Sequence, residues 1–177
     1  LGLKGHNRAT FEKRLMRNLE VLLEDAPVHE ITRISGRVLV VYDAAAGADA
    51  PAKAAQLIAR VPGVARVSCG FACERNMDDI CEAAHQALGE AGDFCTWKVV
   101  GRRNHTDFPI DSMQINQIVG EHLCGLFPDK KVKMKGADVE VHVEVVQGMA
   151  YVYAQTMRGV GGLPVGTAGK VVCLLSS

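Results

Sequence analysis

The glycine-rich stretch Gly159–Lys170 is the part of this sequence whose composition most suggests chemistry, because glycine loops that end in lysine can hold nucleotide phosphates. Its spacing does not suit that purpose. A Walker-type loop needs glycine five residues before the Gly-Lys pair, where this chain has Pro164, and Ser or Thr after the lysine, where it has Val171. A dinucleotide fingerprint that starts at Gly159 fails at Pro164 as well. We therefore interpret the stretch as a connector between domains, followed by a buried strand over 171–175.

Cysteine and histidine are the second group that could do chemistry, as metal ligands or as a nucleophile and its base. Cys81 and His85 are four residues apart in a segment of helical periodicity, a workable spacing for two zinc ligands. The chain has no Cys-x-x-Cys pair, and most of its cysteines lie in apolar segments, which is typical of buried thiols in a reducing compartment. A metal-binding or redox module would use Cys69, Cys73, Cys81 and His85. We place this alternative below a structural role, and we predict no metal site and no catalytic residue in the chain.

Lysine and arginine form the third group. They number 20 against 20 acidic residues, so the formal net charge is zero and any attraction to nucleic acid must be local. Residues 1–17 hold one acidic residue, Glu12, and five basic ones: Lys4, Arg8, Lys13, Arg14 and Arg17. A second basic cluster consists of Lys98, Arg102 and Arg103, followed by Asn104 and His105. Such side chains suit the phosphates, sugars and base edges of a nucleic acid. A solvated charged surface is the alternative for each cluster taken alone.

The elements that position these groups follow from the periodicity of the sequence. The first half predicts a helix from Asn7 to about Asp25, strands over 28–35 and 37–43, a helix from Pro51 to about Arg60, and a β-branched element over 63–71. With a strand before Leu3, this is the order of a ferredoxin-like domain.

The second half predicts further elements of both kinds: a helix over 77–88, a strand over 94–101, a helix from Asp111 or Ser112 to Leu126, a basic turn over 130–135, and a hairpin over 139–146 and 149–156. We expect His122 on the apolar face of its helix and His142 to point outward from its strand. No apolar run reaches the ~18 residues that span a bilayer. The predicted fold class is α+β.

Several stretches together resemble the bacterial and archaeal tRNA 4-thiouridine synthases, the ThiI family. Leu3-Lys4-Gly5-His6-Asn7-Arg8 is similar to the family's opening motif, and Lys98-Val99-Val100-Gly101-Arg102-Arg103 with Ile115-Asn116-Gln117-Ile118-Val119-Gly120 is similar to its THUMP domain. Gly161-Gly162-Leu163-Pro164-Val165-Gly166-Thr167 is similar to the connector into its PP-loop ATP-pyrophosphatase domain and is the most specific of these motifs. The resemblance covers nearly the whole chain.

The resemblance implies a ferredoxin-like domain over 1–75 without its first strand, a THUMP domain over 76–158, and a connector with the first strand of the ATP-pyrophosphatase domain over 159–177. It implies that the two domains grip tRNA while a catalytic domain outside this chain makes 4-thiouridine with ATP and magnesium. A cysteine desulfurase would supply the sulfur. A role in thiamine thiazole synthesis, a homodimer and a cytoplasmic location are implied for the parent protein, which is not a membrane protein.

The resemblance also implies which residues contact RNA: Lys4, Asn7 and Arg8 in the first domain, and Lys98, Arg102, Arg103 and Asn116 in THUMP. Asn116 has a structural alternative, a bond to backbone near Phe108-Pro109. Ser176 would begin the ATP loop, and no other cofactor-binding residue is expected in this chain. Two departures from the family pattern are Gly101, where alanine is more common, and Asn104-His105-Thr106. Another THUMP enzyme, such as a tRNA methyltransferase, is the competing assignment.

Overall fold

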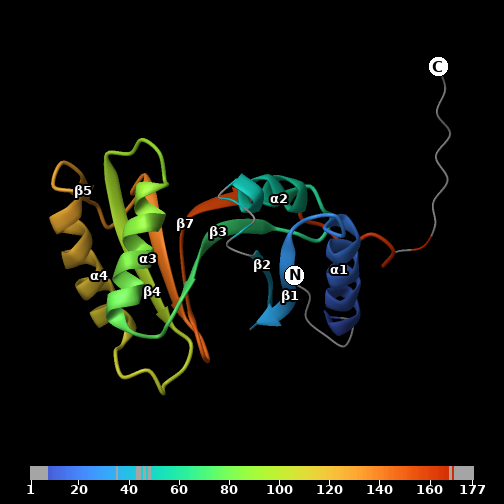
Figure 1. Cartoon of the computed structure of the whole chain (residues 1–177), viewed down its shortest axis with the longest axis horizontal. Coiled ribbons are helices and arrows are strands. Elements are labelled where there is room, and N and C mark those ends of the chain that lie inside the picture. The colour runs from blue at the N-terminus through green and yellow to red at the C-terminus, as the bar shows by residue number, and fades with distance from the viewer. Residues whose placement is uncertain are drawn as a thin grey trace. The chain divides into compact units, whose positions relative to one another are not determined.

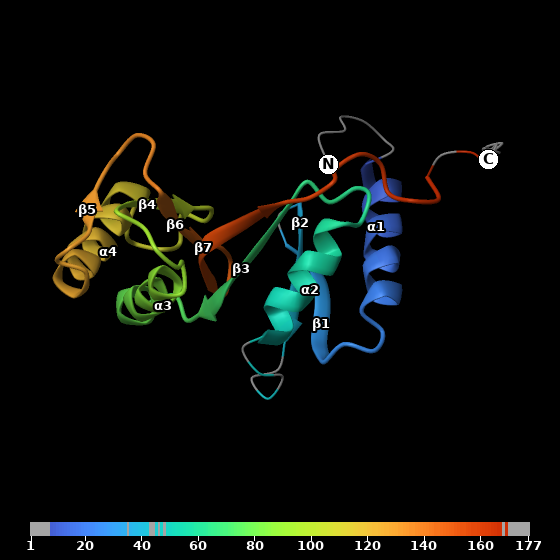
Figure 2. The same cartoon turned by 90° about the horizontal axis from the view of Figure 1, so that it is seen from above.

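The computed structural model of the chain describes residues 8–167 and 169, apart from positions 35, 43, 44, 46 and 48. The predicted strand before Leu3, the Asn7 cap and the strand over 171–175 lie outside the described residues. Contacts divide the chain into two compact units, one of residues 68–156 and one of residues 1–67 with 157–177. The chain passes from one unit to the other within β3 and again within β7 (Figures 1 and 2).

The first unit is built from two helices and a hairpin: α1 (Arg8–Leu22), β1 (Val28–Ile34), β2 (Arg37–Tyr42) and α2 (Asp49–Ala59). β1 and β2 pair antiparallel, from Val28 opposite Tyr42 to Ile34 opposite Arg37. Apolar residues at helical spacing on α1, Leu15 and Leu19, are buried with Ala54 and Ile58 of α2. The predicted helices and hairpin are confirmed, although α2 begins two residues before Pro51.

The second unit is a sheet with two helices on one face (Figure 1). Its elements are β3 (Arg66–Cys73), α3 (Met77–Gly89), β4 (Thr96–Arg103), α4 (Ser112–Leu126), β5 (Lys131–Val132), β6 (Val139–Val145) and β7 (Ala150–Arg158). The strand order is β3-β7-β6-β4-β5. β4 runs parallel to both of its neighbours, and β6 and β7 form the predicted antiparallel hairpin around Gly148, whose φ of 88° suits glycine.

Alternation along β4 and β6 determines what this sheet presents on each face. Trp97 and Val99 of β4 and Val141 and Val143 of β6 point into the core beneath α3 and α4. Lys98 and Arg102 lie at the alternate positions of β4 and therefore belong to the opposite face. The sheet therefore buries one face and leaves the other for polar side chains.

Both helices of the second unit have side-chain caps. Asn76 accepts a hydrogen bond from the Asp79 amide, so α3 begins at Met77. Asp111 and Gln114 form a reciprocal capping box, which confirms the predicted cap of α4. These caps hold the first turn of each helix beside the end of a strand.

His122 lies differently from its sequence-based expectation, whereas His142 lies on the expected face but is partly buried. His122 is exposed, because the buried stripe of α4 is Ile115, Val119 and Leu123 and position 122 is turned away from it. His142 lies on the polar face of the sheet but does not point into solvent. Its ring stacks on Tyr153 with centroids 4.9 Å apart, and its side chain is 20% exposed.

The two-residue strand β5 was not predicted, since the basic stretch 130–135 reads as a turn. Asp138 holds this region in place. Its Oδ2 accepts hydrogen bonds from the amides of Cys95 (3.0 Å) and Thr96 (2.8 Å), and its own amide donates to Thr96 Oγ1 (3.0 Å). The bonds from Thr96 and Cys95 lower the pKa of the Asp138 carboxyl below its ordinary value.

We therefore expect the contribution of Asp138 to be lost in acid. A carboxyl whose pKa is lowered by folding stabilises the fold above its unfolded pKa, 3.8, and loses that effect as the pH falls through the lowered value. Asp138→Ala should lower the thermal midpoint at pH 7, and the gap to wild type should narrow below about pH 4. Circular dichroism melts at several pH values measure this gap. Asp129→Ala is the matched control, and a gap that stays constant down to pH 2 would contradict the assignment.

Candidate nucleic-acid interface

The end of β4 is bound to α4 by two side chains of the helix, and a third side chain, that of Arg103, binds the loop between them. Asn116 Oδ1 accepts a hydrogen bond from the Gly101 amide at 2.6 Å, and Ser112 Oγ accepts one from the Arg103 amide at 3.0 Å. Arg103 Nη1 donates to the Phe108 carbonyl at 3.2 Å. A Cβ on Gly101 would lie 3.0 Å from Asn116 Oδ1, so helix and strand are in close contact here. Asn116 thus bonds backbone, at Gly101 rather than near Phe108-Pro109.

The loop after β4 is held from its other side by Arg75. This arginine donates from Nη1 to Asp107 Oδ2 at 2.8 Å, and its guanidinium lies 5.6 Å from the centre of the Phe108 ring. The hydrogen bond from Arg75 lowers the pKa of the Asp107 carboxyl. The segment 104–111 is therefore shaped by Arg75 and Arg103 together. These two arginines act mainly on the loop itself.

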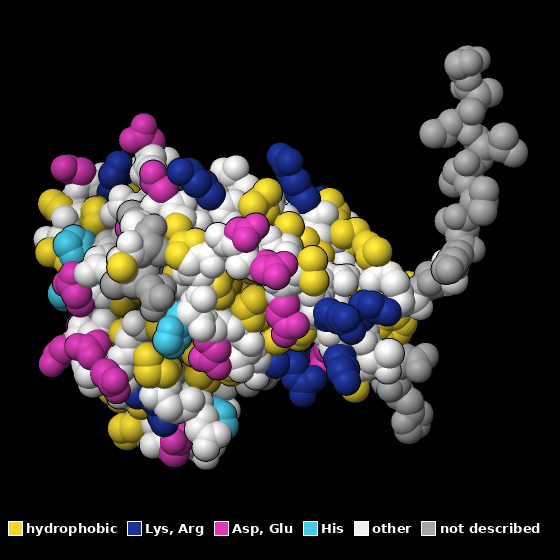
Figure 3. All heavy atoms as spheres, turned by 45° about the vertical axis from the view of Figure 1, so that its right-hand side comes forward, with side chains coloured by type: hydrophobic (Ala, Val, Ile, Leu, Met, Phe, Trp, Pro, Cys, Tyr) yellow, Lys and Arg dark blue, Asp and Glu magenta, His cyan; other side chains and the backbone are white. Residues whose placement is uncertain are grey.

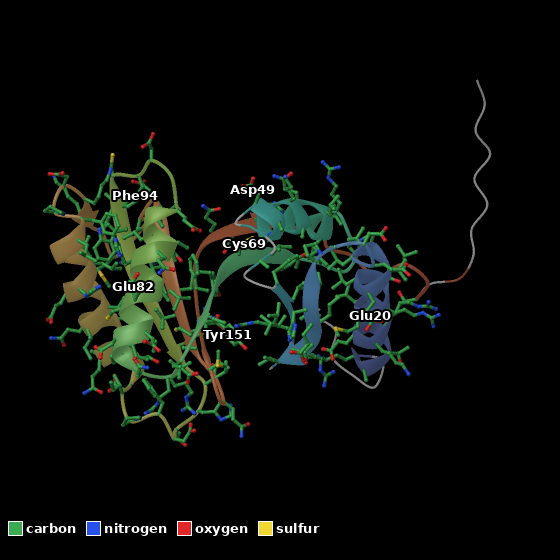
Figure 4. The ribbon with its side chains drawn as sticks, viewed as in Figure 1. Glu20, Asp49, Cys69, Glu82, Phe94 and Tyr151 are labelled. Carbon is green, nitrogen blue, oxygen red and sulfur yellow. The ribbon has the colours of Figure 1, made fainter. Side chains whose placement is uncertain are left out.

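The polar face of the sheet carries a chain of paired side chains. Lys98 Nζ binds Glu140 Oε1 at 2.8 Å, and the second carboxylate oxygen of Glu140 lies 3.4 Å from His142 Nε2. Next to the stacked pair of His142 and Tyr153, the Tyr153 hydroxyl donates to Glu144, which is 1% exposed. The Lys98 hydrogen bond lowers the pKa of Glu140. In Figure 4, Tyr151 lies on the side of the sheet away from the helices, whereas Phe94 lies with them.

Of the basic residues predicted from the THUMP motif, Arg102 is the most available. It is exposed, it shares the polar face with Lys98, and it forms no ion pair with another described residue. The Lys98 side chain is 19% exposed and neutralised by Glu140. Of the two motif cations on this face, Lys98 is thus paired, and Arg102 forms no ion pair with another described residue.

Of the residues predicted to contact RNA in the first unit, only Arg8 is described, and it is paired. Lys4 and Asn7 lie outside the described residues. Arg8 Nε bonds Glu12 Oε1 at 2.7 Å, and Arg33 Nη1 bonds the other oxygen of Glu12 at 2.5 Å. The pKa of Glu12 is lowered, first by the hydrogen bond from Arg8. The charge of Arg8 is therefore shared with a carboxylate.

Three further cations of α1 were grouped with Arg8 in the sequence but were not among the predicted contacts. Lys13, Arg14 and Arg17 line a hollow of about 490 Å³ together with Thr10, Phe11, Gly166 and Thr167. The sequence shows that these residues are charged. It does not predict that they lie beside the connector, because about 150 residues separate the two segments.

The alternative metal or redox site finds no support in the geometry. Among the described residues, no group of three or more Cys, His, Asp or Glu side chains could hold a metal ion. Burial raises the pKa of the Cys69 and Cys81 thiols, and that of Cys73 to about 11. Cys81 is buried as expected, but Cys95 and Cys124 are exposed. Cys173 and Ser176 lie outside the described residues.

No helix in the described part of the chain is long and apolar enough to cross a membrane.

The connector is unlike a phosphate loop. The amides of Gly159, Val160 and Gly161 donate to the carbonyls of Ala65, Ala59 and Val64, so these N–H groups are already bonded. The connector is held to the first unit by its own backbone.

Two family models match the chain: the ThiI ferredoxin-like domain over residues 1–68 and the THUMP domain over residues 74–155. A probable tRNA sulfurtransferase of Streptococcus sanguinis (strain SK36) is 32% identical over 177 residues, which are 99% of this chain and 43% of the relative. The chain thus spans less than half the length of the curated relatives it matches.

Two solved structures are similar over most of the chain. A 4-thiouridine synthetase in complex with RNA and bound ATP has a TM-score of 0.83 and 28% identity, over 99% of this chain and 44% of that one. PH1313 from Pyrococcus horikoshii Ot3 has a TM-score of 0.81 and 32% identity, over 94% and 55%. With a ThiI ferredoxin-like domain followed by a THUMP domain, the chain belongs to the ThiI family.

Proposed function

We propose that this chain is the tRNA-binding part of an ATP-dependent tRNA sulfurtransferase that makes 4-thiouridine. One observation carries the proposal: a ThiI ferredoxin-like domain is followed by a THUMP domain in one chain. Nearly the whole of this chain aligns with relatives that are named tRNA sulfurtransferases. The similar structure that was solved with RNA supports the binding role. The ThiI ferredoxin-like match favours this assignment over the methyltransferase alternative.

The chemistry of the whole protein belongs to the same proposal. ATP and magnesium would act in a catalytic domain beyond the connector, with Ser176 at the start of its ATP loop. A cysteine desulfurase would donate the sulfur in the cytoplasm. A homodimer and a thiamine role complete the proposal for the parent protein. We keep 1–75, 76–158 and 159–177 as the proposed domain boundaries.

The proposed RNA contacts fall into two kinds once their surroundings are considered. Arg102 is exposed and unpaired among the described residues, so it can bind a phosphate directly. Arg103 and Asn116 hold the backbone of their own motif, so they would act by positioning the loop 104–111. Lys98 and Arg8 would have to share their charge with Glu140 and Glu12. Lys4 and Asn7 complete the proposed set.

RNA binding should depend strongly on salt. If ~4–6 phosphates are neutralised, affinity for tRNA should fall about a hundredfold or more between 50 and 200 mM salt. Filter binding over this range measures the slope. The net-neutral chain gives little general attraction to polyanions, so a DNA duplex of equal length should bind more weakly. Equal affinity for tRNA and the duplex would count against the proposed function.

The alanine variants of Arg102 and Arg103 should differ in thermal stability. Arg102→Ala should weaken tRNA binding by ~1–2 kcal/mol and leave the thermal midpoint unchanged, because it removes a surface charge. Arg103→Ala should lower the thermal midpoint as well, because the Phe108 carbonyl loses its donor. Fluorescence anisotropy and circular dichroism give the two readouts.

Lys131→Ala is the matched control for these variants, since Lys131 is an exposed cation on β5 outside the motif. It should affect binding less than Arg102→Ala. A larger effect for the Lys131 variant, or a destabilised Arg102 variant, would contradict the division of roles.

Nucleotide chemistry should be absent from this chain. The bonded amides of Gly159, Val160 and Gly161 cannot cradle phosphates without breaking their contacts with the first unit. Isothermal calorimetry with Mg-ATP should give no saturable heat, and no pyrophosphate should be released. A saturable signal that Lys170→Ala abolishes would show that the connector is a nucleotide site.

A further inference from the structure

Helix α1 presents three basic side chains on its solvent side. Lys13 and Arg17 are four residues apart, and Arg14 and Arg17 are three apart, so they lie together on the helix surface. All three are exposed, and none forms an ion pair with another described residue. They differ in this respect from Arg8 and Arg33, which bind Glu12. Figure 3 shows Lys and Arg side chains gathered toward the right of the face that it draws.

The connector forms the other wall beside this helix. Asn18 Nδ2 donates to the Val165 carbonyl at 3.2 Å, which ties the connector to α1. Thr167 closes a turn on Pro164, donating from Oγ1 at 2.6 Å and from its amide at 3.2 Å. Gly166 has a φ of 84°, and a Cβ there would lie 3.1 Å from Arg14 Cζ. The backbone thus passes directly beside the Arg14 guanidinium.

The hollow between these walls is open and cationic. Its seven lining residues include three cations and two threonine hydroxyls, and none of them is acidic. Guanidinium groups bind phosphate oxygens through paired N–H donors, and the Thr10 hydroxyl can add a single hydrogen bond, whereas the Thr167 hydroxyl already donates to the Pro164 carbonyl. The three cations of the lining carry donors and no acceptors, which suits phosphate oxygens, so recognition here would be of the backbone.

We propose that this hollow is a subsite for the sugar–phosphate backbone of RNA, formed by Lys13, Arg14 and Arg17 of α1 and closed by Gly166 and Thr167 of the connector. The inference rests on the proposed function and adds a contact region to it. Because the connector is one wall of the subsite, RNA bound there holds the connector against α1. Binding of RNA and docking of the connector are then thermodynamically linked.

The first test compares two double variants of the first unit that remove the same number of positive charges. Arg14→Gln/Arg17→Gln should weaken tRNA binding at least about tenfold and reduce the salt slope by roughly 1–2, because two phosphate contacts are lost. Lys53→Gln/Arg60→Gln, which changes two exposed cations away from the hollow, should stay within about twofold of wild type. Anisotropy titrations of labelled tRNA at several salt concentrations give both quantities.

The outcomes separate this inference from the proposed function. If wild type does not bind tRNA, the proposed function fails and this subsite fails with it. If wild type binds and the two double variants behave alike, the function stands and the subsite is overturned. Calorimetry with Mg-ATP distinguishes a free nucleotide as the ligand: saturable heat that the Arg14/Arg17 variant abolishes would overturn the assignment to RNA.

Amide hydrogen exchange tests the link to the connector without relying on affinity. Exchange at Val165–Thr167 should slow by about tenfold or more when wild type is saturated with tRNA, because the opened connector binds RNA less well. The Arg14→Gln/Arg17→Gln variant, held at saturating tRNA, should lose this protection. Unchanged exchange in wild type would overturn the coupling.

Discussion

The alternation of side chains along β4 is the constraint on which the second unit depends. Trp97 and Val99 point into the core with zero and 8% exposure, and they bring α3 and α4 onto one face. A shift of register by one residue would bury Lys98 and Arg102 and expose the tryptophan. The strand is fixed at both ends, by Asp138 at its first amides and by Asn116 and Ser112 at its last. The position of Arg102 follows directly from these contacts.

The electrostatics of the chain depend on pairing more than on total charge. A neutral chain can bind a polyanion only where cations are left unpaired by their neighbours. Glu12 and Glu140 each neutralise much of the charge of an adjacent basic residue, and both have lowered pKa values as a result. Arg102 on the sheet and the three cations of the hollow form no ion pair with another described residue. Each of them therefore keeps its charge available to a polyanion.

Local patterns in the sequence predicted most of the elements. The helical stripe of α1, the Asp111 cap and the turn at Gly148 depend on residues a few positions apart, and all three were found in the structure. β5 was missed because two residues carry no periodicity. His122 was misplaced because the apolar stripe of α4 is narrower than the sequence suggests.

The candidate site was harder to predict, since its contacts join distant residues. The bond from Lys98 to Glu140 joins two neighbouring strands, β4 and β6, and no residue near Lys98 in the sequence indicates it. Asn18 meets Val165 across 147 positions. The sequence motif contains Arg102, Arg103 and Asn116 and does not distinguish their roles. Their hydrogen bonds in the structure do: Arg103 and Asn116 bind backbone groups of the motif and its loop, whereas Arg102 is a surface cation.

The connector also affects the order in which the chain can fold as it is made. The second unit is continuous in sequence, whereas the first unit needs residues from both ends, 8–67 and 157–167. Gly159, Val160 and Gly161 supply bonds to the segment 59–65 that cannot form until they leave the ribosome. The sheet over 68–156 can therefore be complete while α1 and the β1–β2 hairpin still lack part of their packing, so vectorial synthesis favours the later domain first.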